Sequence, residues 1–182
     1  MIPPVLTDLC AYLDSCTGPV NLDRLQHLLE AQPITRDDLA EFCQFGTTTY
    51  CRNIVARSDW YEMLCICWRA GHKSYIHDHH GSSFAFKVIA GTATEIICTP
   101  TGRTRADQPL VRPVNVTRYP AGAVCGSASF HIHEVVNESA RGEDLITLHI
   151  YSPPLAMRIY AYDDESAPSH STPQREAVEA LA

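Results

Sequence analysis

From Tyr50 onward the sequence is divided into short runs of β-branched, aromatic and aliphatic residues, usually separated by Gly, Pro, Asn or Asp. Such runs predict strands, and many short strands with turn residues between them predict a sandwich or a barrel. The stretch 99–113 is polar and carries prolines, so we expect a loop or a loose hairpin there. We therefore predict a mainly β fold, with strands at 50–55, 61–68, 84–89, 92–98, 114–119 and 144–151.

The residues before this β-rich part have a helical pattern instead. Apolar residues recur every three or four positions in three segments, which indicates amphipathic helices. Asn21 and Thr35 are suited to cap the second and third helices, and Pro33 separates them. Because each helix has an apolar stripe, we expect the helices to pack against the β part. The stripes are Leu6, Leu9, Cys10 and Leu13, then Leu22, Leu25, Leu28 and Leu29, then Leu39, Phe42 and Cys43.

The length and charge of the chain limit what it can be. Its 182 residues suit a single domain, which we place at 1–162 with helices to about residue 45. The polar stretch 163–182 is predicted to be a flexible tail. Neither a membrane span nor a secretory signal is visible, so we expect a cytoplasmic protein away from the membrane. The net charge of -7, without a basic stripe, argues against nucleic acid as a partner.

The 8 cysteines include no C-x-x-C pair. Cys65 and Cys67 lie two apart in an apolar run, where a free cysteine behaves as a small hydrophobe, so we expect them in the core. Structural zinc held by thiolates is the alternative, and the absence of the usual ligand spacing disfavours it. In the expected cytoplasmic setting the thiols are reduced.

Two pairs of histidines carry the functional information. His77 and His79 point to the same face of an extended chain, and Asp78 points away. Imidazoles on one wall of a barrel can share a metal ion at about 2 Å each. His131 and His133 also share a face, and spacing alone does not choose between them as the third ligand. The alternative is that these histidines only form hydrogen bonds within the protein.

The surroundings of these histidines resemble the two motifs of the cupins, the second with a longer gap between its halves. The resemblance implies a jelly-roll barrel, or double-stranded β-helix, preceded here by a short N-terminal helical segment. The H-x-x-x-N half of the second motif selects His133 over His131. The matching residues are Gly71, His77, His79 and Gly91 in the first motif, and Pro120, Gly122, His133 and Asn137 in the second.

One departure from the cupin pattern has chemical weight. Phe84 occupies the position where the first motif has a glutamate. Three neutral imidazoles without a carboxylate leave the full double charge on a divalent metal. Such a site favours an anionic substrate that enters the coordination sphere. A thiolate is a good candidate, because a bound metal deprotonates a coordinating thiol.

Within the cupins the chain resembles the thiol dioxygenases, and most closely the cysteine dioxygenase family, from about Tyr50 to Pro154. The resemblance implies a monomeric enzyme with one mononuclear non-haem iron(II) per chain. Its partners would be a small thiol and O2, and it would oxidise L-cysteine to cysteine sulfinic acid. The matching residues are Tyr50-x-Arg52-Asn53, Trp68, His77-Asp78-His79, Lys87, Gly91, His133-x-Val135-x-Asn137 and Leu148-His149-x-Tyr151-Ser152-Pro153-Pro154.

The same resemblance implies a role for each site residue. Arginine makes bidentate contacts to carboxylates, and two residues that lie two apart in a strand face the same way. Some family members join a cysteine at the Phe84 position to the tyrosine through a thioether, which Phe84 cannot form. The implied roles are metal ligands for His77, His79 and His133, substrate binding for Arg52, Tyr50 and Tyr151, and catalysis for Tyr151 with His149 as its hydrogen-bonded support.

Three other functions fit the same residues. A dioxygenase for another small thiol acid, such as 3-mercaptopropionate, is the first, although relatives using that substrate tend to have glutamine at the Arg52 position. Zinc-dependent hydrolysis is the second, since three histidines and a water also suit zinc. A non-catalytic cupin that binds a metal and senses a small acid is the third.

Overall fold

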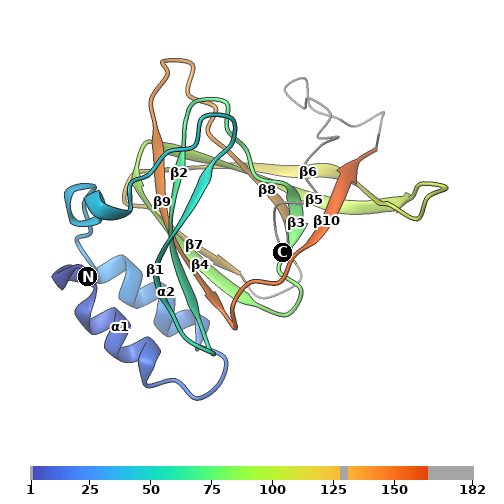
Figure 1. The fold of residues 1–182 in the computed structure, drawn as a ribbon. Helices are drawn as coiled ribbons and strands as arrows, with labels where there is room; N and C mark the ends of the chain where they lie inside the picture. Colours follow the sequence, from blue (N-terminus) through green and yellow to red (C-terminus); the bar gives the residue numbers. More distant parts are fainter. Residues whose placement is uncertain (1, 128–130, 164–182) are drawn as a thin grey trace.

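The computed structural model describes residues 2–127 and 131–163, with the helices at the start and the strands after them (Figure 1). The side chain of Asn21 caps the second helix by accepting a hydrogen bond from the backbone N–H of Arg24. The third predicted helical segment is a 3-10 helix, and Thr35 and Asp38 form hydrogen bonds with each other at its start. The three expected helical segments are therefore confirmed. The helices are η1 (Pro4–Leu6), α1 (Thr7–Asp14), α2 (Leu22–Ala31) and η2 (Asp37–Phe42).

All six predicted strands are present, as β1, β2, β4, β5, β6 and β9. The histidine pairs lie on or beside two short strands, β3 and β8, and the sequence reasoning missed β7 and β10. The strands are β1 (Cys51–Arg57), β2 (Glu62–Trp68), β3 (Ile76–Asp78), β4 (Ser83–Ala90), β5 (Thr92–Arg103), β6 (Pro109–Pro120), β7 (Val124–Ser127), β8 (Ile132–Val136), β9 (Leu145–Ser152) and β10 (Arg158–Tyr162).

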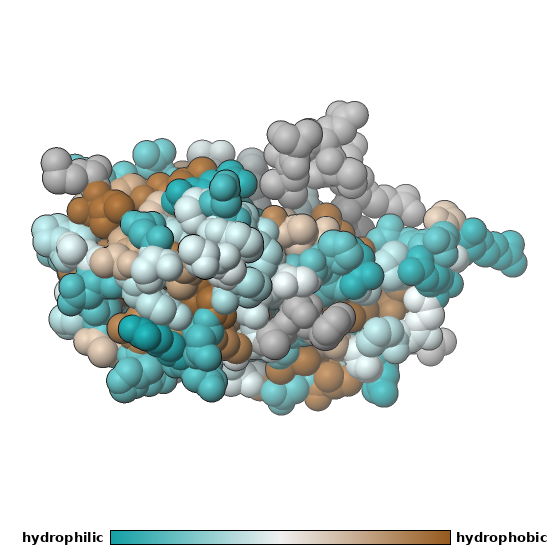
Figure 2. All heavy atoms as spheres, turned by 90° about the horizontal axis from the view of Figure 1, so that it is seen from below, coloured by the Kyte–Doolittle hydropathy of each residue, from teal (hydrophilic) through white to brown (hydrophobic). Residues whose placement is uncertain are grey.

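Of the two structures predicted for the stretch 99–113, a loop or a loose hairpin, the hairpin is found, and its strands are longer than expected. β5 and β6 stay paired from Thr92 opposite Pro120 to Arg103 opposite Pro109. The pairing register shifts near Pro100, so the ladder accommodates this proline at an irregularity. The hairpin projects away from the rest of the fold in Figure 1, and its outer end is hydrophilic in Figure 2. Its polarity, which suggested a loop, reflects solvent exposure of a paired ribbon.

The strands form two layers. The first is a five-stranded sheet in the order β1-β2-β9-β4-β7, and the second is a closed barrel of β10, β3, β8, β5 and β6. β10 closes the barrel by pairing antiparallel with β3 and parallel with β6. Side chains from both layers share one apolar core, which includes Leu64, Ile66 and Phe84 from the sheet and Ala93 and Val135 from the barrel.

The five-stranded sheet is covered on both faces. Every residue of β2 is buried, and alternate residues face opposite ways. Leu64, Ile66 and Trp68 face the second layer. Met63, Cys65 and Cys67 pack in a separate core with the leucines of α1 and α2. The core position predicted for the two cysteines is thus confirmed, as is the packing of the helices against the β part.

Gly91 forms the tight turn between β4 and β5. Its backbone φ is +79°, in the left-handed region that favours glycine. A Cβ atom placed there would lie 2.6 Å from the carbonyl oxygen of Asp144. Both constraints require glycine at this position, where the cupin motif also has one.

Two further findings complete the fold. No helix in the described part of the chain combines the length and the apolar character that crossing a membrane requires. All eight cysteines lie in the described part and are free thiols. The predicted tail 163–182 lies, from residue 164 on, outside the described residues, and the single domain at 1–162 stays a prediction.

Candidate active site

Three buried histidines converge between the two layers. His77 on β3 lies opposite His133 on β8 in the strand register, and His79 follows the end of β3. The Nε2 atoms of His79 and His133 are 3.2 Å apart, and one ring nitrogen from each of the three histidines lies within 4.8 Å of the others. None of the three is more than 6% exposed. The structure therefore brings together the three residues predicted as metal ligands.

The outer nitrogens of two of these rings are held by oxygen atoms. Nδ1 of His77 lies 2.8 Å from the carbonyl oxygen of Tyr75, and Nδ1 of His133 lies 2.6 Å from Oε1 of Glu95. Because both partners accept hydrogen bonds, they place a proton on Nδ1 and leave the Nε2 lone pair toward the centre. This is the arrangement that metal-binding histidines use.

The donor set fits a divalent metal ion. Burial, and then the neighbouring His133, lowers the pKa of His77 to about 3, and burial lowers the pKa of His79 as well. Both rings are therefore neutral at physiological pH, as metal ligands must be. Two nitrogens at about 2.1 Å from one ion, at a right angle, lie about 3 Å apart. The observed separation of 3.2 Å matches this value closely.

Glu95 on β5 is a site residue that the sequence reasoning missed. Its carboxylate oxygen Oε1 contacts Nδ1 of His133 and lies 3.4 Å from Nε2 of His131. Its other oxygen, Oε2, accepts a hydrogen bond from the hydroxyl of Tyr119. Burial alone would raise its pKa, but the hydrogen bonds from the two histidines hold that pKa below its usual value. Glu95 is thus a buried carboxylate that orients His133, and His131 lies outside the three-histidine cluster. A single acidic residue inside an apolar strand was the available signal.

Tyr151 and His149 belong to a hydrogen-bonded chain along β9. The hydroxyl of Tyr151 lies 3.0 Å from Nδ1 of His149, and Nε2 of His149 lies 2.9 Å from the hydroxyl of Thr147. The indole N–H of Trp68 donates to the same hydroxyl at 3.0 Å. Burial raises the pKa of Tyr151 and lowers that of His149, so both groups are neutral. Thr147 was not predicted, although it shares the alternate spacing of His149 and Tyr151.

Arg52 lies beside Tyr151, at one end of this series of hydrogen bonds. Its guanidinium carbon is 6.0 Å from the centre of the Tyr151 ring, and its Nη2 lies 3.3 Å from a carboxylate oxygen of Glu62. Tyr50 stacks on Trp68 with the ring centres 4.5 Å apart. Arg52 therefore approaches the predicted site, and it also forms an ion pair with Glu62. Glu62 was not anticipated.

Phe84 packs beside both the histidines and the tyrosine. It lies directly opposite Tyr151 in the pairing of β4 with β9, and it is fully buried. Its ring centre is 4.2 Å from that of His79 and 6.4 Å from that of Tyr151. An apolar ring thus forms one wall of the site.

Asp78 points away from the histidines, as predicted. Its carboxylate accepts hydrogen bonds from Nε of Arg158 and the hydroxyl of Tyr160, at 3.1 Å and 2.7 Å. Both partners lie on β10, so Asp78 fixes β10 against β3 and, with it, the strand that carries His77. Its role is to support the wall of the site.

The chain resembles two kinds of known protein. The cysteine dioxygenase type 1 of Danio rerio is 29% identical over 157 residues, which cover 85% of this chain and 77% of that protein. The cysteine dioxygenase type 1 of Homo sapiens is 28% identical over 155 residues, covering 84% of this chain and 76% of the human protein.

Solved structures support the fold. A conserved protein with a double-stranded β-helix domain from Klebsiella pneumoniae superposes with a TM-score of 0.53 at 15% identity, covering 67% of this chain and 88% of that one. A protein from Thermus thermophilus gives 0.52 at 16% identity, covering 64% and 94%. The predicted cupin fold is confirmed. The family model described as cysteine dioxygenase type I matches residues 8–165, so the chain belongs to the cysteine dioxygenase type I family of enzymes.

Proposed function

We propose that this protein is an iron(II)-dependent dioxygenase that oxidises the thiol of L-cysteine to cysteine sulfinic acid. The observation that carries the proposal is the buried all-nitrogen cluster of His77, His79 and His133, with Arg52 and Tyr151 beside it. Both atoms of O2 end on the sulfur, so the thiol and O2 combine with no other product. Membership of the family supports the reaction class.

The three histidines would hold one iron(II) ion. Because all three ligands are neutral, the ion keeps its double positive charge and attracts a thiolate. When bound, iron(II) supplies the redox chemistry that lets O2 react with the thiolate sulfur. The protein's own contribution is to keep the Nε2 lone pairs of His77 and His133 directed inward, through the carbonyl of Tyr75 and the carboxylate of Glu95.

Arg52 would bind the carboxylate of the amino acid. Its guanidinium already lies beside one carboxylate, that of Glu62, at the edge of the site. A substrate carboxylate would take up the hydrogen bonds that Arg52 directs toward the site, and this fixes the orientation of the thiol. The aromatic ring of Tyr151 lies beside the guanidinium of Arg52 and limits how it can move.

Tyr151 would donate its hydroxyl proton in a hydrogen bond to the oxygen that develops negative charge. The chain through His149 and Thr147 can point its hydrogens toward Tyr151, since the Trp68 indole N–H donates to the Thr147 oxygen and leaves the threonine proton for His149. In that direction Nδ1 of His149 donates to Tyr151 and frees the phenol proton for the substrate. Phe84 excludes water from the same side.

All the proposed site residues come from one chain, which is compatible with the predicted monomer. The partners are the small thiol and O2. The monomeric state and the cytoplasmic location stay predictions.

The function is tested by oxygen uptake of the iron(II)-loaded protein with cysteine, 3-mercaptopropionate, cysteamine and mercaptosuccinate. We expect cysteine to be the best substrate, with one O2 consumed per sulfinate formed. Cysteamine lacks the carboxylate and should react slowly. Strongest turnover of 3-mercaptopropionate would assign the enzyme to another thiol acid, and no oxygen uptake with any thiol would indicate a binding protein.

Arg52→Gln tests the carboxylate contact. Losing a charge-assisted hydrogen bond worth roughly 1.5–3 kcal/mol should raise the KM for cysteine about 10- to 100-fold. The KM for cysteamine should stay unchanged, since it has no carboxylate. Arg57→Gln, an exposed arginine on the same strand, is the matched control. Equal effects of the two variants on the KM for cysteine would remove Arg52 from substrate binding.

A further inference from the structure

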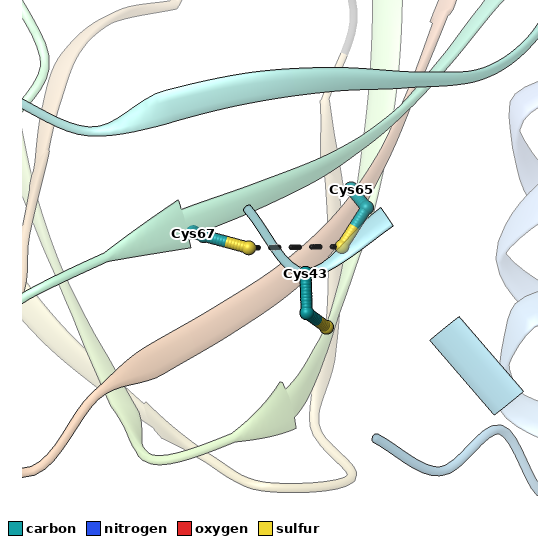
Figure 3. A group of neighbouring side chains, drawn as sticks. All are labelled: Cys43, Cys65 and Cys67. Carbon is teal, nitrogen blue, oxygen red and sulfur yellow. Dashed lines mark hydrogen bonds between the residues drawn. The ribbon is translucent and has the colours of Figure 1, made fainter. Parts of the chain in front are cut away.

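A second cluster of metal-ligand side chains lies on the other face of the five-stranded sheet. Cys43, which follows η2, meets Cys65 and Cys67 of β2, and Figure 3 shows the three side chains close together. The three sulfur atoms lie within 4.8 Å of one another, and those of Cys65 and Cys67 are 4.0 Å apart. The proposed active site uses none of them, because they face the helices while Leu64 and Ile66 face the second layer.

The sulfur spacing suits a metal ion without a large rearrangement. A tetrahedral or trigonal centre with metal–sulfur bonds of about 2.3 Å holds its sulfur ligands about 3.8–4.0 Å apart. The Cys65–Cys67 separation already has this value. The sulfur of Cys43 has to move by less than about 1 Å to reach this spacing. Cys43 directly follows the short 3-10 helix η2. Cys43 is only half-buried, so an ion can enter on its side.

The side-chain amide of Asn53 also contacts this cluster. It donates a hydrogen bond to the Cys67 sulfur at 3.7 Å. A hydrogen-bond donor beside the sulfur suits a thiolate, which is the form that coordinates metals.

We propose that Cys43, Cys65 and Cys67 bind a soft thiophilic cation with a filled d shell, Cu(I) or Zn(II). Soft thiolate ligands select these ions over hard cations such as magnesium and calcium, which prefer oxygen ligands. Three sulfurs are enough for trigonal Cu(I). Zn(II) takes a fourth ligand, and water has access on the side of Cys43. Binding releases the thiol protons to solvent and transfers no electrons.

The site joins the helical cover to the catalytic sheet. Cys43 follows η2, whereas Cys65 and Cys67 lie on the strand paired with β1, which carries Arg52. A bound ion would cross-link these parts of the chain and stabilise the fold, because it binds the folded state selectively. This proposal is independent of the reaction proposed above.

The experiment uses the reduced, iron(II)-loaded protein under anaerobic conditions, so that iron occupies the histidine cluster. One equivalent of Zn(II) or of Cu(I) is added, and X-ray absorption at the zinc or copper edge identifies the ligands. We expect about one bound ion per chain with sulfur neighbours, at about 2.3 Å for zinc. The Cys43→Ser variant should bind at least about 10-fold more weakly, with unchanged iron content and turnover.

Two further variants make the result decisive. Cys67→Ala should lose the sulfur signal as well, and Cys16→Ser, a half-buried thiol elsewhere, should bind the ion as the unchanged protein does. The unfolding temperature of each variant without metal shows that it is folded. Neighbours only of nitrogen and oxygen at about 2.0–2.1 Å would overturn the proposal. Equal affinities of the Cys43→Ser and Cys16→Ser variants would overturn it too, and oxygen uptake with cysteine would be unaffected in either case.

Discussion

The histidine and cysteine clusters contact opposite faces of one sheet and are held in different ways. In the histidine cluster, oxygen atoms of Tyr75 and Glu95 fix ring nitrogens, and all three rings are buried. In the cysteine cluster, the sulfurs are held by packing and by weak contacts such as the one from Asn53, and Cys43 is half-buried. Hydrogen bonds fix a ligand's orientation, whereas packing mainly fixes its position. The difference fits the two proposals, a preorganised histidine centre for the reaction and a more adaptable cysteine site for a soft metal ion.

The largest contrast should come from removing one ligand in each cluster. His77→Ala should lose iron and lower cysteine turnover by more than about 1,000-fold, because the metal's contribution to the reaction is lost. The Cys67→Ala variant should keep both its iron and its turnover of cysteine. Iron content by elemental analysis and oxygen uptake measure the two effects, and a loss of iron in Cys67→Ala would show that the clusters are not separate.

Tyr151→Phe removes only a hydrogen bond inside the site. Turnover should fall about 100-fold while iron content stays near that of the unchanged protein, as for loss of one donor to a developing charge. Tyr160→Phe, which loses a contact to Asp78 on the outer side of β3, is the control. Steady-state oxygen uptake at saturating cysteine measures turnover, and full activity of Tyr151→Phe would exclude this role.

Acid should weaken the metal-free protein through the inner cluster. The pKa of His77 is about 3 in the folded protein, below the value of about 6.5 for an unfolded histidine. The unfolded state therefore binds more protons between these values, and stability falls as the pH drops from 6.5 toward 3. At pH 5 the loss from His77 alone is about 2 kcal/mol relative to pH 7.

Urea unfolding of the metal-free protein at both pH values measures this loss. His77→Gln should reduce the difference in free energy of unfolding, and Cys43→Ser should leave it unchanged. The same difference in His77→Gln and the unchanged protein would mean that His77 is not the group responsible.

The smallest effect should come from Glu95→Gln, which keeps the shape of the side chain and removes its charge. Iron affinity should fall about 10-fold, because the amide holds the Nδ1 proton of His133 less strongly. Competition with a chelator measures it. Glu138→Gln, at the partly exposed carboxylate that contacts Thr94, should not change the affinity. If both glutamines bind iron equally well, Glu95 is not part of the support for His133.

The sequence predicted the elements whose pattern is local. The runs of β-branched, aromatic and aliphatic residues in β2 and β9 and the cap at Asn21 each identify a strand or a helix without knowledge of its partner. β7 and β10 were missed because they are short and are defined by pairing with distant strands. The length of the β5–β6 hairpin was also missed, since polar residues and prolines are compatible with an exposed ribbon at its irregular positions.

The difference between local patterns and distant contacts also explains which residues of the candidate site were predicted. Spaced motifs identified the three histidines, Arg52 and the pair of His149 and Tyr151. Glu95, Thr147 and Glu62 stand in no motif, and only the register between strands brings them to their partners. A residue that acts through a cross-strand contact leaves little trace in local spacing.

The benzyl side chain opposite Tyr151 has a consequence for the covalent chemistry open to this wall of the site. A cysteine at this position could join the phenol ring through a thioether, whereas Phe84 carries no sulfur. This wall therefore cannot acquire a covalent bridge from position 84, and the two side chains meet only through packing.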